Sequence, residues 1–263
     1  MKSDRLGSIA LAAVAFFVVA FLQLPIIVVL LAAISETSYL TIPPKGLTLH
    51  WFSVVLNDVD YLAATWTSLW LALLSTLAAA AVGVMAALMI HRKLLPGAQL
   101  LSSLFMAPMI LPSIVLGVAL LHYFAALGIR GSSLGLILAH TVLIVPYVIR
   151  ASLSGLQSID GSLTDAARVL GAGPIETFRL VVLPLLKPAL VAGGLLAFVT
   201  SLDNVPVSIF LLGANQTTLP VKIFASVEQG VDPSVAAAST LLILLTGAAL
   251  VIAERWTGFH KHV

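Results

Sequence analysis

The chain has 263 residues, of which 60% are hydrophobic and 9% are charged, and its mean hydropathy is +1.12. Soluble domains carry about 25% charged residues, so this composition excludes an ordinary soluble protein and indicates that the chain's main solvent is the bilayer. The net charge of +2 comes from thinly spread residues, which excludes a basic patch for nucleic acid, and the absence of cysteine excludes disulfides and thiolate chemistry.

Apolar runs predict six transmembrane helices. A helix needs about 20 apolar residues to cross the hydrocarbon core. The runs cover residues 9–33, 65–90, 100–123, 133–149, 189–212 and 234–253. The first run is too long for a signal peptide and is interpreted as an anchor. We therefore expect an all-α integral membrane protein.

The basic residues predict the orientation of these helices, because cytoplasmic loops are enriched in Lys and Arg. One set of termini and alternate loops holds ten of them: Lys2, Arg5, Arg92, Lys93, Arg150, Arg168, Arg179, Lys187, Arg255 and Lys261. The opposite set holds only Lys45, Arg130 and Lys222. The first set is expected to be cytoplasmic, so both termini lie inside.

Two connections are unusually long. Residues 35–64 are expected outside, with a short amphipathic helix near 49–56, and residues 150–188 are expected inside. The predicted organisation is an N-terminal helix and external loop over 1–64, a membrane core over 65–253 and a cytoplasmic tail over 254–263. The phosphate-binding pattern G-x-x-x-x-G-K-[ST] is absent from the sequence, so the chain is not expected to hydrolyse ATP.

The internal connection carries a helix-start signature. Ser162 is the predicted cap, followed three residues later by Asp165 in the first turn, where the helix dipole favours an acid. Gly171 and Gly173 can end this helix, because glycine tolerates left-handed backbone.

A second short helix is expected directly afterwards. Pro174 suits its first position and Glu176 its first turn. Pro184 and Pro188 are expected to bracket the return of the chain into the membrane. The two helices would then lie across the cytoplasmic face.

Two interpretations of the first helix compete. Ala166, Ala167 and Gly171 supply small side chains that can enter a groove on a partner, while Asp165 and Arg168 supply a polar tip. Alternatively, this is an interfacial helix-turn-helix in which the two alanines reflect helix propensity alone.

The same residues resemble a known motif. The run from Asp165 through Ala166, Ala167 and Gly171 to Val181, Leu183 and Pro184 is similar to the E-A-A-x-x-x-G-x(9)-I-x-L-P loop of ABC importer permeases, with Asp for Glu and Val for Ile. The resemblance extends over residues 65–246, where Pro108 to Gly117, Ala139 to Thr141 and Ser201 to Asn204 are among the segments similar to the family. Within the family, the chain resembles the second permease of spermidine/putrescine importers.

The resemblance implies a type I ABC importer permease fold with a cytoplasmic coupling helix, in a bacterial inner membrane. The coupling residues would be Asp165, Ala166, Ala167, Arg168, Gly171 and Pro184. It also implies two ATPase subunits, a second permease chain and an external solute-binding protein as partners, and no cofactor. The tail histidines, His260 and His262, form no convincing metal site.

Asp203 is the one carboxylate that the sequence places well within a span. Such a charge needs a partner, water or a cavity. Pro206 interrupts the helix nearby and would suit a wet cavity. Either Asp203 faces the translocation path and attracts a cationic solute, or it makes a polar contact between helices or near the outer interface. Asn204 follows Asp203, where the resembled subgroup commonly has an acid.

The other candidate path residues are Asn204, Ser208, His140 and Tyr147. For His140, a neutral ring bonded to a backbone carbonyl is the simpler interpretation. The expected solute is a polyamine or related amine, with an opine, amino acid derivative or phosphonate as alternatives. An ion-coupled secondary transporter would show inverted repeats and several intramembrane charges, and a membrane-embedded enzyme would need convergent polar residues on neighbouring spans.

Overall fold

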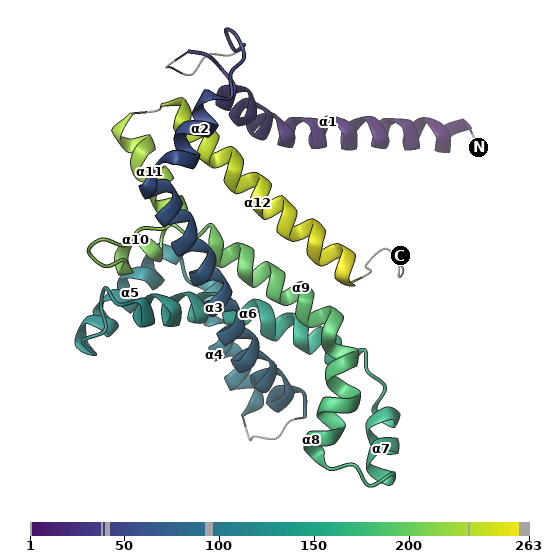
Figure 1. Ribbon diagram of the computed structural model, residues 1–263. Helices are drawn as coiled ribbons and strands as arrows, with labels where there is room; N and C mark the ends of the chain where they lie inside the picture. The colour runs from purple at the N-terminus through teal and green to yellow at the C-terminus, as the bar shows by residue number, and fades with distance from the viewer. Residues whose placement is uncertain (1, 38, 40–42, 93–96, 231, 258–263) are drawn as a thin grey trace. The chain divides into compact units, whose positions relative to one another are not determined.

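The computed structural model describes residues 2–37, 39, 43–92, 97–230 and 232–257, and within these ranges all regular structure is helical (Figure 1). The expected all-α class is confirmed for these residues. Lys93, His260, Lys261 and His262 lie outside them. The helices are α1 (Lys2–Ala33), α2 (His50–Asn57), α3 (Val59–His91), α4 (Ala98–Ile110), α5 (Ser113–Ala126), α6 (Ser133–Gln157), α7 (Gly161–Val169), α8 (Pro174–Thr177), the π-helix η1 (Phe178–Val182), α9 (Leu183–Leu202), α10 (Ser208–Leu211), α11 (Leu219–Gln229) and α12 (Pro233–Thr257).

Among the described residues, five helical segments are long and apolar enough to cross a membrane. They are Leu11–Ala33, Val59–His91, Ser133–Gln157, Pro174–Leu202 and Pro233–Ile252. The predicted span over residues 189–212 is shifted, because the helix begins at Pro174 and ends at Leu202. The predicted span over residues 100–123 is not one straight helix, because α4 and α5 are bent by 108° relative to each other.

Pro112 causes this bend. Its ring disfavours helical backbone at the preceding residue, and it has no N–H to donate. Leu111 accordingly leaves the helix with ψ 137°, and Pro112 is also extended with ψ 131°. The Leu111 amide still bonds the Ala107 carbonyl at 3.2 Å, and the Leu116 amide opens the next helix on the Pro112 carbonyl at 3.1 Å. The apolar run over residues 100–123 is long enough to cross a membrane, but Pro112 divides it into two helices.

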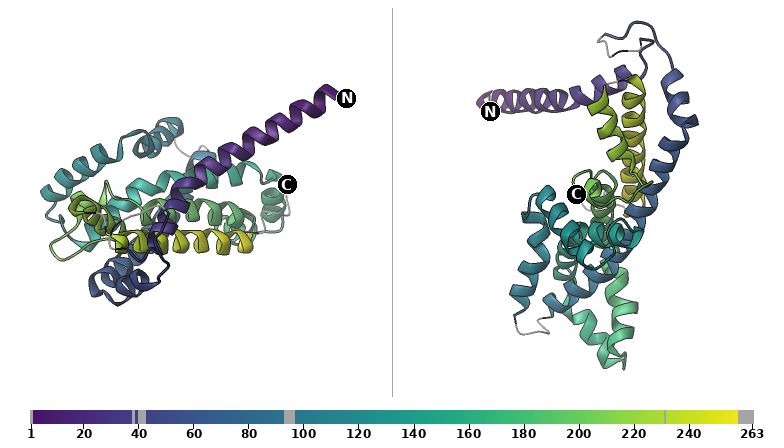
Figure 2. Two further views of the ribbon diagram at one scale, coloured as in Figure 1. Left: turned by 90° about the horizontal axis from the view of Figure 1, so that it is seen from above. Right: turned by 90° about the vertical axis from the view of Figure 1, so that its left-hand side faces the viewer.

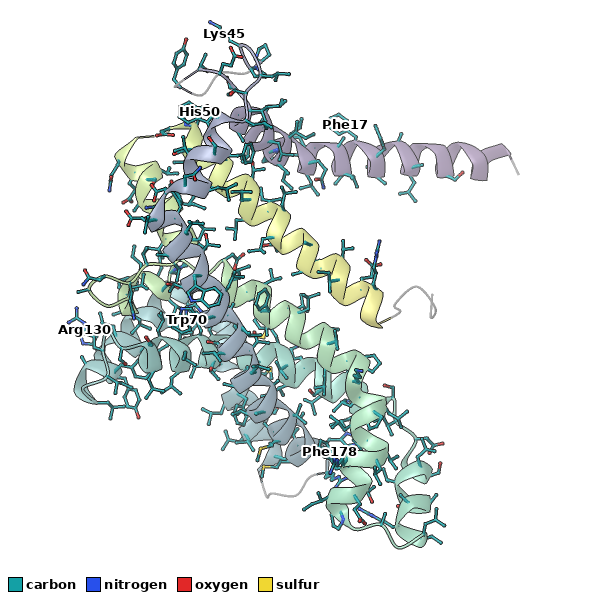
Figure 3. All side chains as sticks on the ribbon, viewed as in Figure 1. Phe17, Lys45, His50, Trp70, Arg130 and Phe178 are labelled. Carbon is teal, nitrogen blue, oxygen red and sulfur yellow. The ribbon has the colours of Figure 1, made fainter. Side chains whose placement is uncertain are left out.

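The chain forms two compact units, the first comprising Met1–Leu62 and Ile223–Leu244. In this unit, α1 exposes the side chains of residues 11–28 on all sides, Phe17 among them (Figure 3). A helix that is apolar all round suits a lipid environment.

The expected short helix near residues 49–56 is confirmed as α2. It is tied to the end of α1, because the Trp51 Nε1–H donates to the Ser35 carbonyl at 2.8 Å. Val55 is its buried residue. The other residues of the helix divide between half-buried Trp51, Phe52 and Val54 and four exposed positions, as expected of an amphipathic segment.

The second unit comprises Ala63–Lys222 and Leu245–Val263 and is built on the pairing of α6 with α9. Glycines allow the two helices to approach closely. A Cβ on Gly193 would lie 2.5 Å from the Ala151 Cβ, and one on Gly155 would lie 2.6 Å from the Ala189 Cβ. At one end of this unit, α7 and α8 form a compact turn (Figures 1 and 2).

Candidate functional site

Asp160, not Ser162, caps the helix that carries the predicted coupling residues. Its carboxylate accepts a 2.9 Å hydrogen bond from the Ser162 amide, and α7 begins at Gly161. This bond lowers the pKa of Asp160, because it favours the charged form. The expected position of Asp165 in the first turn is wrong for the same reason, since the earlier start leaves no acid there. Asp160 and Ser162 both suit the cap position, and the helix begins after the earlier of the two.

The predicted end of this helix at Gly171 is confirmed. Gly171 has φ +89°, a left-handed conformation that suits glycine. Its amide bonds the Arg168 carbonyl at 2.9 Å, and the Ala172 amide bonds the Ala167 carbonyl at 3.0 Å. These two bonds make a Schellman motif, so the helix has a defined stop.

The second helix starts as predicted but does not end as predicted. Pro174 is its first residue, and the Glu176 carboxylate accepts the Gly173 amide at 3.0 Å. The helix then continues through η1 into α9, so it is not a separate short helix, and Pro184 and Pro188 lie inside one continuous helical segment. In η1, the Leu183 amide bonds the Phe178 carbonyl five residues back. This wide turn accommodates Pro184, which has no N–H for the α-helical ladder.

The surface of α7 is open and carries one weak ion pair. The Arg168 Nη1 lies 3.7 Å from the Asp165 Oδ1, and both side chains are mostly exposed at 60% and 73% respectively. Such a pair contributes less than about 1 kcal/mol. Ala166 is exposed and Ala167 is half-buried.

The turn between α7 and α8 presents apolar side chains to the surroundings. Val169 and Leu170 are each 87% exposed, and Ile175 is 81% exposed. Together with the small residues of α7, they form a surface that suits protein docking and offers no reactive group.

His140 holds a buried polar network rather than lining an open path. The ring is fully buried, with Nδ1 2.8 Å from the Ser201 hydroxyl and Nε2 3.0 Å from the Ser208 hydroxyl. The expected partner, a backbone carbonyl, is therefore wrong. Ser208 donates its one hydrogen to the Asn204 carbonyl at 2.5 Å. It must then accept from His140 Nε2–H, while Nδ1 accepts from Ser201.

Asp203 lies at the end of α9 rather than within a span. It is the C-cap residue, exposed, and its amide bonds the Val199 carbonyl at 3.2 Å. Asn204 then turns the chain, because its Oδ1 accepts the Val207 amide at 2.9 Å. The helix therefore ends before Pro206 and is not interrupted by it. The expectation of a buried carboxylate is wrong for this chain by itself.

The remaining candidate, Tyr147, is not brought together with Asp203. The Tyr147 backbone lies beside Gly193, because a Cβ added to Gly193 would be 3.3 Å from the Tyr147 carbonyl oxygen. Asp203 is ten residues further along the chain, about 15 Å at the helical rise. Tyr147 is half-buried and Asp203 is exposed, whereas Ser208 is buried with His140.

Helix α11 was missed in the sequence, although a signal for it exists. Thr218 precedes Leu219 and Pro220, a sequence that suits a helix start, and the Lys222 amide bonds the Thr218 carbonyl at 2.9 Å. The Ser68 hydroxyl accepts the Leu219 amide at 2.8 Å and so satisfies a donor at the start of the helix. No sequence signal links these two residues.

Within the described ranges, no three His, Cys, Asp or Glu side chains are placed to hold a metal ion. Around His140, the polar groups that converge are the Ser201 and Ser208 hydroxyls, the imidazole ring and the Asn204 carbonyl. The arrangement therefore suits conformational and docking roles.

Comparison with known proteins adds a family-level match. Residues 79–258 match the family model described as binding-protein-dependent transport system inner membrane component. The chain is 34% identical over 247 residues to the spermidine/putrescine transport system permease protein PotC of Haemophilus influenzae, covering 94% of this chain and 96% of that protein. It is 32% identical over 241 residues to the putrescine transport system permease protein PotI of Escherichia coli, covering 89% and 85%.

A solved structure matches the fold along the whole chain. It is the crystal structure of a bacterial ABC transporter involved in the import of the acidic polysaccharide alginate, with a TM-score of 0.73, 18% identity, and coverage of 100% of this chain and 98% of that chain. At this identity the likeness concerns the fold.

Proposed function

Because the chain belongs to the family of binding-protein-dependent transport system inner membrane components, we propose that it is one permease subunit of an ATP-driven importer for a polyamine or a related organic amine. The observation that carries the solute class is the 34% identity to PotC along nearly the full length of both chains. The importer would also contain two ATPase subunits, a second permease that would be a different chain, and an external solute-binding protein.

The proposed topology has six spans with both termini in the cytoplasm. It counts the bent pair α4 and α5 as one span and rests on the distribution of Lys and Arg. The proposed organisation keeps an N-terminal helix and external connection over residues 1–64, a core over 65–253 with the coupling connection 150–188, and a tail over 254–263. Only residues up to 257 of that tail are described.

In this proposal, α7 is the coupling helix. Ala166 and Ala167 enter a groove on the ATPase, Asp165 and Arg168 fix the register, and Gly171 ends the helix. Pro184 acts indirectly, through the π-turn that joins the docking surface to α9. ATP-driven closure of the two ATPases would move this turn and switch the membrane path between two states.

The solute path would include Asp203, Asn204 and Tyr147. Asp203 is the charge that recruits a cation, because it is exposed at the end of α9 and has no ion-pair partner among the described residues. His140 and Ser208 would support the path from behind, by fixing the turn after Asp203.

The test is uptake of labelled spermidine by the assembled transporter in proteoliposomes. We expect Asp203→Asn to reduce uptake at low solute concentration by about fivefold, the upper effect of an exposed charge pair. Glu228→Gln is the matched control, since Glu228 is also an exposed carboxylate. The amount of co-purified ATPase should be equal in all three proteins.

Three results would contradict the proposal. Unchanged uptake in Asp203→Asn would make Asp203 a structural residue. An anionic cognate solute would overturn the solute class. Uptake that collapses with an ionophore and continues without ATP would indicate an ion-coupled transporter.

A further inference from the structure

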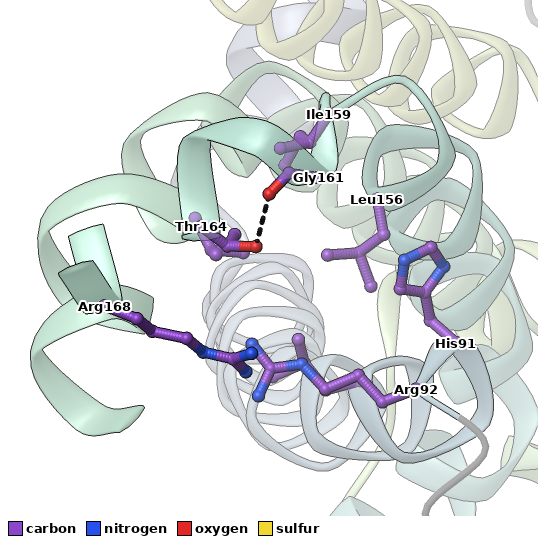
Figure 4. A pocket seen from close by; sticks show the side chains of 9 residues that line it. His91, Arg92, Leu156, Ile159, Gly161, Thr164 and Arg168 are labelled. Atoms are coloured by element: carbon purple, nitrogen blue, oxygen red, sulfur yellow. Dashed lines mark hydrogen bonds between the residues drawn. The ribbon is translucent and has the colours of Figure 1, made fainter. Parts of the chain in front are cut away.

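A cavity of about 370 Å³ lies where the ends of α3 and α6 meet α7 and η1 (Figure 4). It is within the second compact unit and is lined on one side by the proposed coupling helix α7. It includes Arg168, which the proposed function also places at the ATPase contact, but neither Ala166 nor Ala167. The residues that line it are Leu88, His91, Arg92, Leu156, Ile159, Gly161, Thr164, Arg168 and Val182. Its volume is at the lower end of the range of small-molecule sites, about 300–1,000 Å³.

The lining changes character from one side to the other. Leu88, Leu156 and Val182 belong to helical segments that are apolar and long enough to cross a membrane. Arg92 directly follows the last residue of α3, and Arg168 lies on α7. In the topology given under Proposed function, on which this step rests, the cavity is at the cytoplasmic level where hydrocarbon gives way to headgroups.

Two guanidinium groups converge in this cavity. Figure 4 shows the Arg92 and Arg168 side chains extending toward each other from α3 and α7. Arg168 has only the 3.7 Å exposed contact with Asp165, and Arg92 has no ion pair within the described part of the chain. Both side chains are exposed, so solvent screens most of their mutual repulsion. An anion between them would be attracted by both cations.

The neighbouring carboxylates supply little of that negative charge. Asp165 reaches Arg168 only at 3.7 Å and both side chains are exposed, while Arg92 has no ion pair among the described residues. The Asp160 carboxylate caps α7 by accepting the Ser162 amide at 2.9 Å. The Thr164 hydroxyl donates to the Gly161 carbonyl at 2.8 Å. Arginine is suited to phosphate oxygens, because its planar fork can donate two parallel bonds.

We infer that this cavity binds the phosphodiester headgroup of an anionic phospholipid. Arg92 and Arg168 bind the phosphate oxygens, and the wall of Leu88, Leu156 and Val182 packs against the start of the acyl chains. A soluble phosphate would use only the charged half of the cavity and leave the apolar wall in water. A basic pocket between helices at the membrane surface is a recognised form of lipid site.

The test is lipid retention by the purified full-length chain in native mass spectrometry. The protein is first equilibrated with mixed micelles containing phosphatidylethanolamine and phosphatidylglycerol at three to one. We expect selective retention of phosphatidylglycerol, and about fivefold weaker binding of it to Arg92→Gln, the loss for one cation that faces an anionic lipid. Arg92→Lys keeps the charge and should retain most of the binding.

Arg130→Gln is the matched control, since it also removes one exposed arginine but lies before the start of α6, at the far end of that helix from the cavity (Figure 3). It should bind phosphatidylglycerol like the unmodified chain. Thermal unfolding in lipid-free detergent checks that Arg92→Gln is folded.

Several outcomes would overturn the inference. One is equal retention of the two lipids by the unmodified protein, which needs no variant. A second is equal binding of phosphatidylglycerol by unmodified protein and folded Arg92→Gln. A third is stabilisation by millimolar inorganic phosphate that matches the lipid, which would identify a soluble-anion site. None of these measurements depends on transport, so they stand apart from the proposed function.

Discussion

Replacing Gly171 with valine should weaken the proposed coupling helix without creating any steric clash. The φ of Gly171 is +89°, and a Cβ at this position would have no neighbour within 4 Å. The whole penalty is therefore backbone strain, about 1–2 kcal/mol for a residue with a Cβ in left-handed conformation. A β-branched side chain belongs at the upper end of that range.

The strain acts on a small structure. The stop of α7 is held by the 2.9 Å bond from Gly171 and the 3.0 Å bond from Ala172, each worth about 0.5–1.5 kcal/mol net. A nine-residue helix has little stability of its own. Strain of this size therefore shifts the equilibrium between the closed and open helix end by about 5- to 30-fold.

The assay is solute uptake per ATP hydrolysed, measured with the assembled transporter in proteoliposomes. We expect Gly171→Val to lower this ratio several-fold, and Gly171→Asn to have a smaller effect because asparagine tolerates the left-handed region. Amide hydrogen exchange at Ala172 should rise in parallel with the loss of coupling.

Gly128→Val is the matched control. Gly128 also has a left-handed φ, +70°, and open space around an added Cβ, but it lies in the connection between α5 and α6. Two results would refute the reasoning. One is normal coupling in Gly171→Val although exchange at Ala172 has risen, and the other is an equal loss of coupling in Gly128→Val.

Three further outcomes are expected. His140→Ala should lose about 1–3 kcal/mol of stability in detergent unfolding, because two buried interhelical hydrogen bonds disappear. Tyr147→Phe breaks no described hydrogen bond and should leave the stability unchanged. Equal stability of the two variants would contradict the network. The lowered pKa of Asp160 means that its cap is fully present above the ordinary pKa of an aspartate and is lost as pH falls through the folded-state value. At neutral pH, Asp160→Ala should therefore speed amide exchange at Ser162 while Asp160→Asn changes it less, and identical exchange in the two would argue against the cap. The purified chain should bind no ATP in calorimetric titration, and specific micromolar binding would overturn the assignment of hydrolysis to a partner.

Local chemistry made part of the coupling connection predictable. Gly171 as a stop, and Pro174 with Glu176 as a start, each act through bonds within a few residues, and the structure places them as expected. The start of α7 was misassigned because Asp160 and Ser162 are both good caps and only two residues apart. Sequence alone does not rank two adequate local solutions.

The membrane segments show a different limit. Hydropathy depends on side chains, so it detects the apolar run around Pro112. It does not detect that Pro112 lacks a backbone N–H, which is what bends the segment. For the same reason, the predicted fifth span extends past Asp203 and Asn204, although the helix ends there and the backbone turns. The partners of His140 lie 61 and 68 residues away, and no local pattern could have identified them.

The π-turn Phe178–Val182 also preserves an angle. An α-helix advances about 100° per residue about its axis. The wide turn takes up one extra residue, because the Leu183 amide bonds the carbonyl five residues back instead of four. The helical residues on the two sides of the turn therefore keep the phase that they would have in an ordinary helix, and α8, and with it α7, keeps its direction about the axis of α9. Without the wide turn, the same extra residue would rotate Ala166 and Ala167 around that axis by about 100°. The direction in which the docking surface faces thus depends on five residues that lie outside that surface.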